Sequence, residues 1–202
     1  MTDNARRVRR AGFTLVEVIV ALAVLLILAA VAIPQVGGYL DQKRIESTAA
    51  QLAIVRDALY LTGTGFRQVI QANASELSHL SSPLTAVDDD SCGNAFSNAE
   101  RNRWPNGGPF VNFVIDATAG MATPIGLANN ALVRAPTTAT TGVTNRLRIT
   151  WTNASLADAE ALDLHVDGTA GWNTGTVQWT PQAGTNGVVT TLYYDIVIDA
   201  TC

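Results

Sequence analysis

The side chains of this chain that could carry out chemistry are few and widely separated. Its histidines are His79 and His165, and neither stands in the His-Glu-x-x-His spacing that binds zinc. The sequence contains no Gly-x-Ser-x-Gly nucleophile turn and no Gly-x-x-x-x-Gly-Lys-Ser/Thr phosphate loop. Each histidine is therefore expected to be a solvated or partly packed residue, and the sequence predicts no enzyme and no cofactor.

Carboxylates are the second group that could bind a ligand, because calcium takes six to eight oxygen ligands in proteins. Asp88-Asp89-Asp90 is the one dense run, and Asp163 and Asp167 flank a segment with the features of a hairpin. Their spacing matches no calcium loop. An acidic, solvated loop beside Cys92 is the preferred interpretation, and no metal site is predicted.

The charge balance argues against nucleic acid as a partner. Only 15% of the 202 residues are charged and the net charge is −4, whereas phosphate binding depends on dense Lys and Arg. A local basic patch remains an open alternative, and its members would be Arg101, Arg103, Arg146 and Arg148. The tryptophans could form a platform for a sugar or a base, but core and rim positions are favoured. They are Trp104, Trp151, Trp172 and Trp179.

The charges and apolar residues are unevenly distributed along the chain. Four of the 13 basic residues lie in the first ten positions, which leaves 9 basic and 16 acidic residues from position 13 onward, a net charge of −7. In all, 48% of the residues are hydrophobic and the mean hydropathy is +0.18, which excludes disorder for the bulk of the chain. The sequence therefore consists of a basic start, an apolar segment and an acidic body.

The apolar segment is long enough to cross a membrane as a helix. From Phe13 to Ile33 only Thr14 and Glu17 are not apolar, and a helix of this length reaches ~31 Å, about one hydrocarbon thickness. The preceding arginines predict a cytoplasmic N-terminus by the positive-inside rule. A cleaved secretory signal peptide is disfavoured, because the apolar run is long and continues through Pro34 into a helical pattern. A plain single-span anchor would leave Glu17 unexplained, since a carboxylate inside a membrane is costly.

The stretch Arg9-Arg10-Ala11-Gly12-Phe13-Thr14-Leu15-Val16-Glu17, followed by the apolar run and Pro34, resembles the class III signal of type IV pilins and pseudopilins. The resemblance covers roughly residues 6–60. It implies that a prepilin peptidase cuts between Gly12 and Phe13 and N-methylates Phe13. It also implies that the mature chain polymerises through its apolar helix, with Glu17 setting the register between neighbouring subunits.

A second helical pattern follows Pro34 and the Gly37-Gly38 pair. Apolar residues recur at helical spacing and form one stripe, which consists of Ile45, Ala49, Leu52, Val55 and Leu59. Gly63 and Gly65 are expected to end this helix near Thr62. A helix break, as a bend or a melted turn, is expected near Pro34–Gly38, because a proline inside a helix removes a hydrogen bond and clashes with the preceding turn.

Residues 66–202 are predicted to form a β-rich head. Short runs of β-branched and aromatic residues predict strands at 110–116, 146–151, 176–179 and 188–199, and the last alternates as an antiparallel strand with one partly wet face. A short helix is expected over 156–163, and loops at 106–109 and 137–144. The fold class is α+β, with a spine helix on a small antiparallel sheet, as the pilin resemblance also implies. The predicted segments are a leader (1–12), a transmembrane and polymerisation helix (13–33), an amphipathic helix (34–65) and a periplasmic or extracellular head (66–202).

The two cysteines, Cys92 and Cys202, are 110 positions apart, which excludes a Cys-x-x-Cys redox or zinc motif. In an oxidising compartment a disulfide between them would close nearly the whole head into one loop, and this pairing is preferred over two buried free thiols. Many pilins carry a disulfide near the C-terminus, which agrees with this interpretation.

The preferred function is a structural, pilin-like subunit of a type IV filament. Its expected partners are other pilin-like subunits, the prepilin peptidase, the inner-membrane assembly machinery and, before assembly, membrane lipid. The precursor is expected to span the bacterial inner membrane once, and the filament to be periplasmic or extracellular. The sequence leaves open a minor pseudopilin of a type II secretion system and a tip-located binding subunit, and a membrane-anchored periplasmic enzyme is the weakest alternative.

Overall fold

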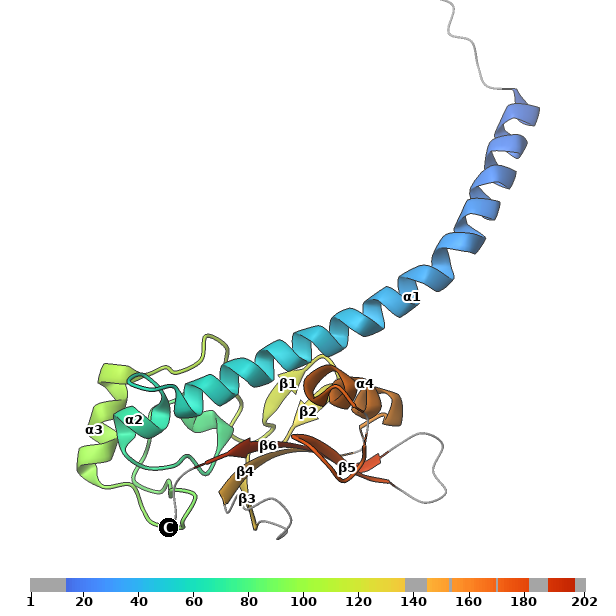
Figure 1. Cartoon of the computed structure of the whole chain (residues 1–202). Coiled ribbons are helices and arrows are strands. Elements are labelled where there is room, and N and C mark those ends of the chain that lie inside the picture. The colour runs from blue at the N-terminus through green and yellow to red at the C-terminus, as the bar shows by residue number, and fades with distance from the viewer. Residues whose placement is uncertain (1–13, 137–144, 153, 170, 182–188, 199–202) are drawn as a thin grey trace, which may run out of the picture. The chain divides into compact units, whose positions relative to one another are not determined.

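The computed structural model describes residues 14–136, 145–152, 154–169, 171–181 and 189–198, without the side chains of residues 31–36, 135, 136, 145, 181 and 190. The chain divides into two compact units, Met1–Gln42 and Lys43–Cys202. An N-terminal helix is followed by shorter helices and a six-stranded antiparallel sheet, which is the expected α+β, pilin-like fold (Figure 1).

The first helix, α1 (Leu15–Tyr60), continues through Pro34 as a single element. The sequence predicted a bend or a melted turn near Pro34–Gly38. No turn is melted there, so that alternative is wrong, and a bend at Pro34 stays a prediction. A proline lacks one N–H donor and so removes one hydrogen bond, whereas its neighbours keep theirs. Gly37 and Gly38 stay helical, and a Cβ at either position would have no neighbour within 4 Å.

The C-terminal part of α1 belongs to the second unit and buries the predicted stripe. Leu52 and Val55 are fully buried, Ile45 and Leu59 nearly so, and Ala49 packs against the core. Burial at positions three and four apart is what an amphipathic helix on a globular core requires. The helix ends at Tyr60, two residues earlier than expected, and Gly63 follows with a φ of +90° that a residue with a Cβ rarely adopts.

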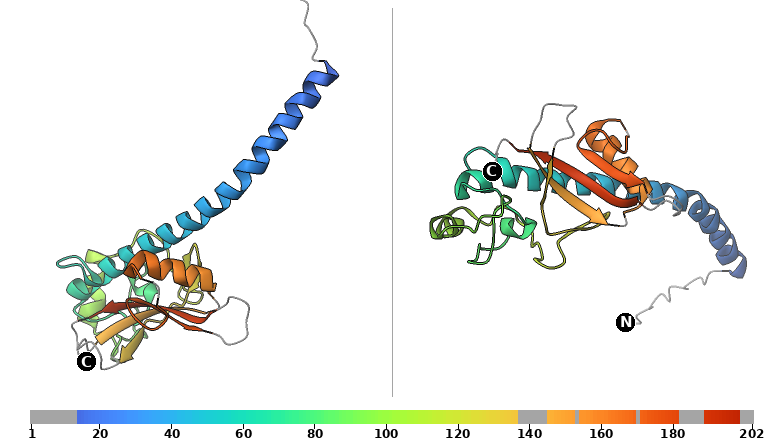
Figure 2. Two further views of the ribbon diagram at one scale, coloured as in Figure 1. Left: turned by 45° about the vertical axis from the view of Figure 1, so that its right-hand side comes forward. Right: turned by 90° about the horizontal axis from the view of Figure 1, so that it is seen from below.

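A compact helical region follows α1 and lies at one end of the second unit (Figures 1 and 2). It contains α2 (Phe66–Ile70), the 3₁₀ helix η1 (Leu77–Leu80) and α3 (Asn98–Gly107). Helix α3 was not predicted from the sequence, and the loop expected at 106–109 is wrong for its first two residues, because the helix extends to Gly107. Its start carries a capping box in which Ser97 accepts from the N–H of Glu100 and the Glu100 carboxylate accepts from Ser97.

The sheet is antiparallel throughout and has the strand order β1-β2-β4-β6-β5, with β3 also paired to β4. Its strands are β1 (Met121–Thr123), β2 (Gly126–Ala128), β3 (Val133–Pro136), β4 (Asn145–Thr152), β5 (Val177–Pro181) and β6 (Val189–Val197). The structure confirms the strands predicted at 146–151, 176–179 and 188–199. It contradicts the strand predicted at 110–116.

Segment 110–116 is a loop because its backbone finds partners outside any sheet. The N–H of Phe110 donates to the carbonyl of Leu80, and the N–H of Ile115 donates to Ser81 Oγ. The side chains of Val111 and Ile115, both in this loop, are buried in the hydrophobic core. The β-branched and aromatic residues of this segment thus contribute side chains to the core without forming a strand. This shows how strongly β propensity depends on context.

The two faces of the sheet differ in polarity. One face is apolar and buried, and it carries Leu147, Ile149 and Trp151 of β4, Leu192, Tyr194 and Ile196 of β6, and Val177 and Trp179 of β5. The opposite face carries Arg148 directly across from Asp195. The alternation along β6 was therefore predicted correctly.

Helix α4 (Leu156–Asp167) lies between β4 and β5 along the chain and contacts β5 and β6. The helix predicted at 156–163 is confirmed at its start, and α4 extends four residues further, to Asp167. Asp163 and Asp167 lie on this helix and do not flank a hairpin. Ser155 is the N-cap residue but makes no capping hydrogen bond, and Asp158 instead pairs with Arg44 of α1 at 3.4 Å.

The outer edge of β5 has its donors occupied. The N–H of Val177 donates to Asp167 Oδ2 at 2.8 Å and the N–H of Trp179 donates to the carbonyl of Trp172 at 2.9 Å. Pro181, at the end of the strand, has no N–H. At the other end of the sheet, β1 is three residues long.

Candidate functional site

The start of α1 is organised around Thr14 and Glu17. Thr14 Oγ1 accepts from the N–H of Glu17 at 3.3 Å, and the N–H of Val18 donates to the carbonyl of Thr14. Thr14 therefore caps the helix, and Glu17 places a carboxylate in its first turn, where the helix dipole favours negative charge. The sequence analysis missed the role of Thr14, although Thr-x-x-Glu before an apolar run is the signal for such a start. Gly12 and Phe13, the predicted processing residues, lie outside the described residues.

An unpartnered apolar surface covers the first turns of α1. Within the described part of the chain, Leu15 is 75% exposed, Leu26 is 71% exposed and the other large apolar residues between them are about half exposed or more. No contiguous apolar surface of this length is expected on a soluble monomer, so it is an interaction surface. No helix among the described residues is long and apolar enough to cross a membrane.

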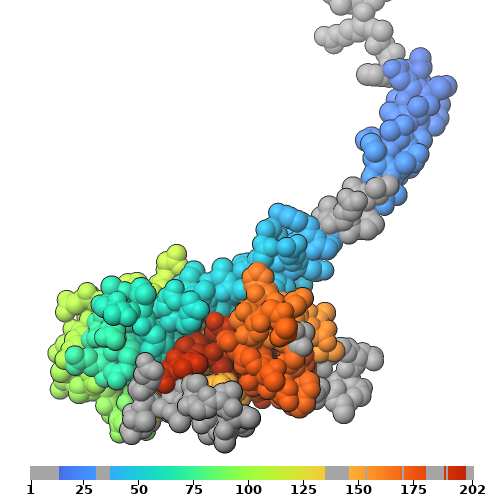
Figure 3. All heavy atoms as spheres, in the orientation of Figure 1, coloured from blue at the N-terminus to red at the C-terminus, as the bar shows by residue number. Residues whose placement is uncertain are grey.

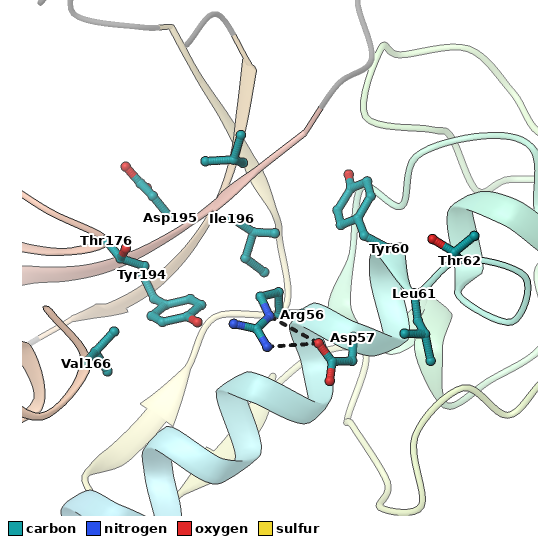
Figure 4. Close-up of a pocket in the computed structure, with 11 residues that line it drawn as sticks. Arg56, Asp57, Tyr60, Leu61, Thr62, Val166, Thr176, Tyr194, Asp195 and Ile196 are labelled. Carbon is teal, nitrogen blue, oxygen red and sulfur yellow. Dashed lines mark hydrogen bonds and ion pairs between the residues drawn. The ribbon is translucent and has the colours of Figure 1, made fainter. Parts of the chain in front are cut away.

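A groove of about 520 Å³ lies in the second unit, between the end of α1, the end of α4 and strand β6. Figure 4 shows Tyr194 and Ile196 pointing into it while Asp195 points away. Arg56 and Asp57 form an ion pair at 3.0 Å on its α1 side, and both are about half exposed. The space-filling view shows β6 at the bottom of a hollow between these helices (Figure 3).

The groove has the size of a ligand pocket. Its described lining contains threonine, tyrosine and aspartate side chains but no histidine, cysteine, serine or lysine. Burial raises the pKa of Tyr194, and the nearby Arg56 opposes that shift. The Tyr194 phenol therefore stays neutral at physiological pH.

Asp163 and Asp167 form the second polar cluster, on consecutive turns of α4. Asp163 Oδ2 accepts from the N–H of Gly171 at 2.6 Å, and Asp167 Oδ2 accepts from the N–H groups of Thr176 and Val177 at 2.8 Å. Burial, together with the adjacent Asp167 carboxyl, raises the pKa of Asp163 to about 6. The pair holds the backbone of the loop that joins α4 to β5.

The acidic run at 88–90 shapes a turn. Asp90 Oδ1 accepts from the N–H groups of Cys92 and Asn94, and Asp88 Oδ2 accepts from the N–H of Thr85. In the described part of the chain, no group of three or more His, Cys, Asp or Glu side chains could hold a metal ion.

Cys92 follows this turn and is not a free thiol. Its sulfur is 2.9 Å from Nη1 of Arg134 on β3. Cys202 lies outside the described residues, so the pairing of Cys92 with Cys202 stays a prediction.

The two histidines lie in different environments. His165 is exposed on α4, as expected. His79 is buried in η1 between the rings of Phe66 and Phe96, and neither ring nitrogen has a hydrogen-bond partner. This burial lowers the pKa of His79 and keeps the imidazole neutral. The expectation of a solvated or partly packed residue is wrong for His79.

The four arginines that could have formed a basic patch are engaged at two places, Arg146 and Arg148 on β4 and Arg101 and Arg103 on α3. Arg148 makes a two-pronged contact with Asp195 at 2.6 and 2.8 Å, and Arg146 reaches the same carboxylate at 3.3 Å. Arg103 donates to the carbonyl of Ile70, and Arg101 to that of Phe96. The charges of the two β4 arginines are thus partly offset by one buried carboxylate, Asp195, whose role was not predicted from the sequence.

Three of the four tryptophans belong to the core, as expected. Trp104, Trp151 and Trp179 are at most 7% exposed. Trp172 is 53% exposed, on the loop that Asp163 and Asp167 hold.

Residues 7–33 match the family model of the prokaryotic N-terminal methylation motif. This motif is the class III prepilin signal of type IV pilins and pseudopilins, which confirms the resemblance seen in the sequence. No curated protein and no solved structure matches the chain at a significant level. The motif supports a pilin-like or pseudopilin subunit with a structural role, and it implies a membrane-anchored precursor, a prepilin peptidase and filament assembly.

Proposed function

We propose that this chain is a pilin-like structural subunit of a type IV filament, made as a precursor that spans the bacterial inner membrane once. A prepilin peptidase cuts between Gly12 and Phe13 and methylates the new amine. The mature chain is then drawn from the membrane into a filament through its apolar helix. The observation that carries this proposal is the methylation motif over residues 7–33, which includes the first turns of α1, where the large apolar side chains from Leu15 to Leu28 are about half exposed or more.

Glu17 supplies the proposed register between subunits. Its carboxylate is exposed and makes no ion pair within the described residues. When apolar helices pack and exclude water, an unpaired carboxylate becomes costly, and the Phe13 amine of a neighbouring subunit can neutralise it. N-methylation keeps that positive charge. A slip in register would separate the Glu17 carboxylate from the Phe13 amine and leave both charges buried without a partner. The ion pair therefore favours one register of the packed helices and adds little net stability to the filament.

The test combines N-terminal sequencing with the variant Glu17→Val. The proposal expects a mature chain that starts at N-methylated Phe13. It also expects Glu17→Val to be cleaved and inserted like the wild type, yet to be depleted at least about tenfold from sheared filaments at equal membrane levels. Thr14→Val is the matched control, because it removes the helix cap and keeps the carboxylate. A chain that still starts at Met1 would refute the proposal. Normal uptake of Glu17→Val along the filament would refute the register role of Glu17, whereas a subunit at the filament tip can tolerate this change.

The stoichiometry of the subunit separates the finer alternatives. An abundant subunit in purified filaments is the main building block of a type IV pilus. A trace subunit that copurifies with secretion machinery is a minor pseudopilin, and one found only at filament ends is a tip subunit. Quantitative mass spectrometry of sheared filaments makes this distinction.

A further inference from the structure

His79 is a buried ionisable residue that the proposed filament assembly does not use. It is 4% exposed and lies between the rings of Phe66 and Phe96, whose centroids are 6.3 and 5.5 Å from that of the imidazole. A neutral imidazole carries one N–H, yet neither ring nitrogen of His79 has a hydrogen-bond partner within the described residues. Burying a polar group without a partner costs stability, so packing alone does not account for a histidine at this position.

The elements of the helical region meet at His79. Phe66 of α2 faces the imidazole with the two ring planes 16° apart. The carbonyl of His79 accepts from the indole N–H of Trp104 on α3 at 2.8 Å. The carbonyl of the adjacent Leu80 accepts from the N–H of Phe110, also at 2.8 Å. A change in the charge of the imidazole therefore acts on α2, η1 and α3 together.

The helical region packs on itself and is joined to the sheet through a loop. Among the described elements, α2 and α3 contact each other, whereas the strands contact one another and α4. Asn130, in the loop between β2 and β3, links η1 to the sheet, because it accepts from the N–H groups of Leu77 and Ser78, both at 2.8 Å. A region whose elements pack on one another can open as a unit at a lower free energy than the whole domain.

Two carboxylates act on the charge of the imidazole. Asp88 and Glu76 favour protonation, but burial has the larger effect and lowers the pKa of His79 below its ordinary value of 6.5. The other charged side chains of α2, of α3 and of the loop before α3 do not contribute to this shift in pKa. They are Arg67, Asp89, Asp90, Glu100, Arg101 and Arg103. The closed helical region therefore holds His79 neutral, and acid favours any state in which the ring is exposed to water.

We infer that the helical region is an acid-sensitive device, which opens when His79 is protonated while the sheet and α4 stay folded. The imidazolium carries two N–H donors, and the closed state offers neither of them an acceptor. Attraction of the cation to the phenyl rings is smaller than the hydration that it gives up. Opening uncovers the aromatic residues around His79, so mild acid turns one end of the head apolar. The inference goes beyond the proposed function, because it concerns the head alone.

The test is hydrogen exchange of the solubilised full-length chain, resolved by peptide, at about pH 7.5 and about pH 5. Each rate is divided by the intrinsic rate at the same pH, so that the ratio reports opening. Protection over residues 66–107 is expected to be at least about tenfold lower than in β4 and β6 at pH 5, which identifies local opening. It is also expected to fall about five- to thirtyfold from pH 7.5 to 5, because one proton changes an opening equilibrium by at most about tenfold per pH unit below 6.5.

Two variants and a control assign the response to His79. His79→Phe keeps an aromatic ring that cannot be protonated, and protection over residues 66–107 is expected to change less than about twofold with pH. His79→Gln is the second variant, with the same expectation, and it decides the matter if His79→Phe does not fold. His165→Gln is the matched control, because His165 is exposed on α4. It is expected to respond to acid as the wild type does.

Two results would overturn the inference. If residues 66–107 are protected as strongly as β4 and β6 at pH 5, the second unit opens only as a whole and the helical region is not a separate device. If the folded His79 variant loses protection in acid as the wild type does, a group other than His79 is titrating. Exchange in the solubilised chain requires no filament, so these results are independent of the outcome for Glu17→Val.

Discussion

The two parts of helix α1 place apolar side chains in opposite environments. In the first unit, residues such as Leu22 and Leu26 are 53% and 71% exposed, whereas in the second unit Leu52 and Val55 are fully buried. The first part is apolar on all sides and the second on one stripe. A stripe can be covered by a single sheet, but an apolar surface on all sides needs several neighbours or lipid. The composition of a helix therefore indicates whether its partner lies in the same chain or outside it.

The largest expected effect tests this comparison directly. Leu52→Ala is expected to lower the free energy of unfolding by ~2–5 kcal/mol, because it leaves a cavity in a packed core. Leu22→Ala is the matched control and is expected to leave the unfolding of the second unit unchanged. Denaturant unfolding of the solubilised full chain, followed by tryptophan fluorescence, measures both. An equal loss for the two variants would mean that the first part of α1 also packs within its own chain.

The next effect concerns the disulfide predicted between Cys92 and Cys202, which would close a loop of the chain. Cys202→Ser is expected to lower the free energy of unfolding of the second unit by ~2–4 kcal/mol, because the unfolded chain loses a constraint. Cys92→Ser should give the same loss, and the double variant no more than either. The helicity of the first part of α1 should not change. A mass measurement on unreduced protein that finds two free thiols would contradict the pairing.

The smallest effect is a pH dependence inside the second unit. The pKa of Asp163 is raised to about 6 in the folded chain, from 3.8. Its stabilising contribution is therefore complete below pH 3.8 and is lost as the pH rises through about 6. Asp163→Asn should remove this decline.

We expect the pH dependence to be visible in the unfolding midpoints of Asp163→Asn and wild type, measured between pH 4 and 7. The difference between the two midpoints should change as the pH rises and level off above about pH 6. The lowered pKa of His79 acts in the opposite direction, since it removes stability as the pH falls below 6.5. His79 is common to both proteins, so it cancels in the difference. A difference that does not change with pH would contradict the burial of the Asp163 carboxyl.

Patterns that repeat at a fixed spacing were predictable from the sequence. The stripe from Ile45 to Leu59 and the alternation along β6 both report burial on one face, and both were predicted correctly. Helix α3 was missed although Ser97-x-x-Glu100 is a start signal, because no apolar period follows it. The apolar segment 110–116 suggested a strand, but no neighbouring strand accepts its backbone.

The candidate sites depended on contacts between distant residues. Thr14 and Glu17 are close in sequence, and their capping pattern was visible there. The support of the Trp172 loop comes instead from β5 and from a hydrogen bond of Gly171 to Asp163 of α4, eight positions earlier in the chain. Asp163 and Asp167 give no local sign of this role, since a carboxylate on a helix normally faces water. Only the folded arrangement distinguishes Trp172 from the three core tryptophans.

The occupied edge of β5 has a consequence for a protein stored at high local concentration. A strand edge with free donors can pair with the same edge of another molecule and extend a sheet without limit. Here Val177 and Trp179 already donate within their own chain, Pro181 has nothing to donate, and β1 is too short to act as a template. The β5 edge is thereby closed to sheet extension between crowded heads, and association there through side-chain surfaces, which can be undone, is favoured instead.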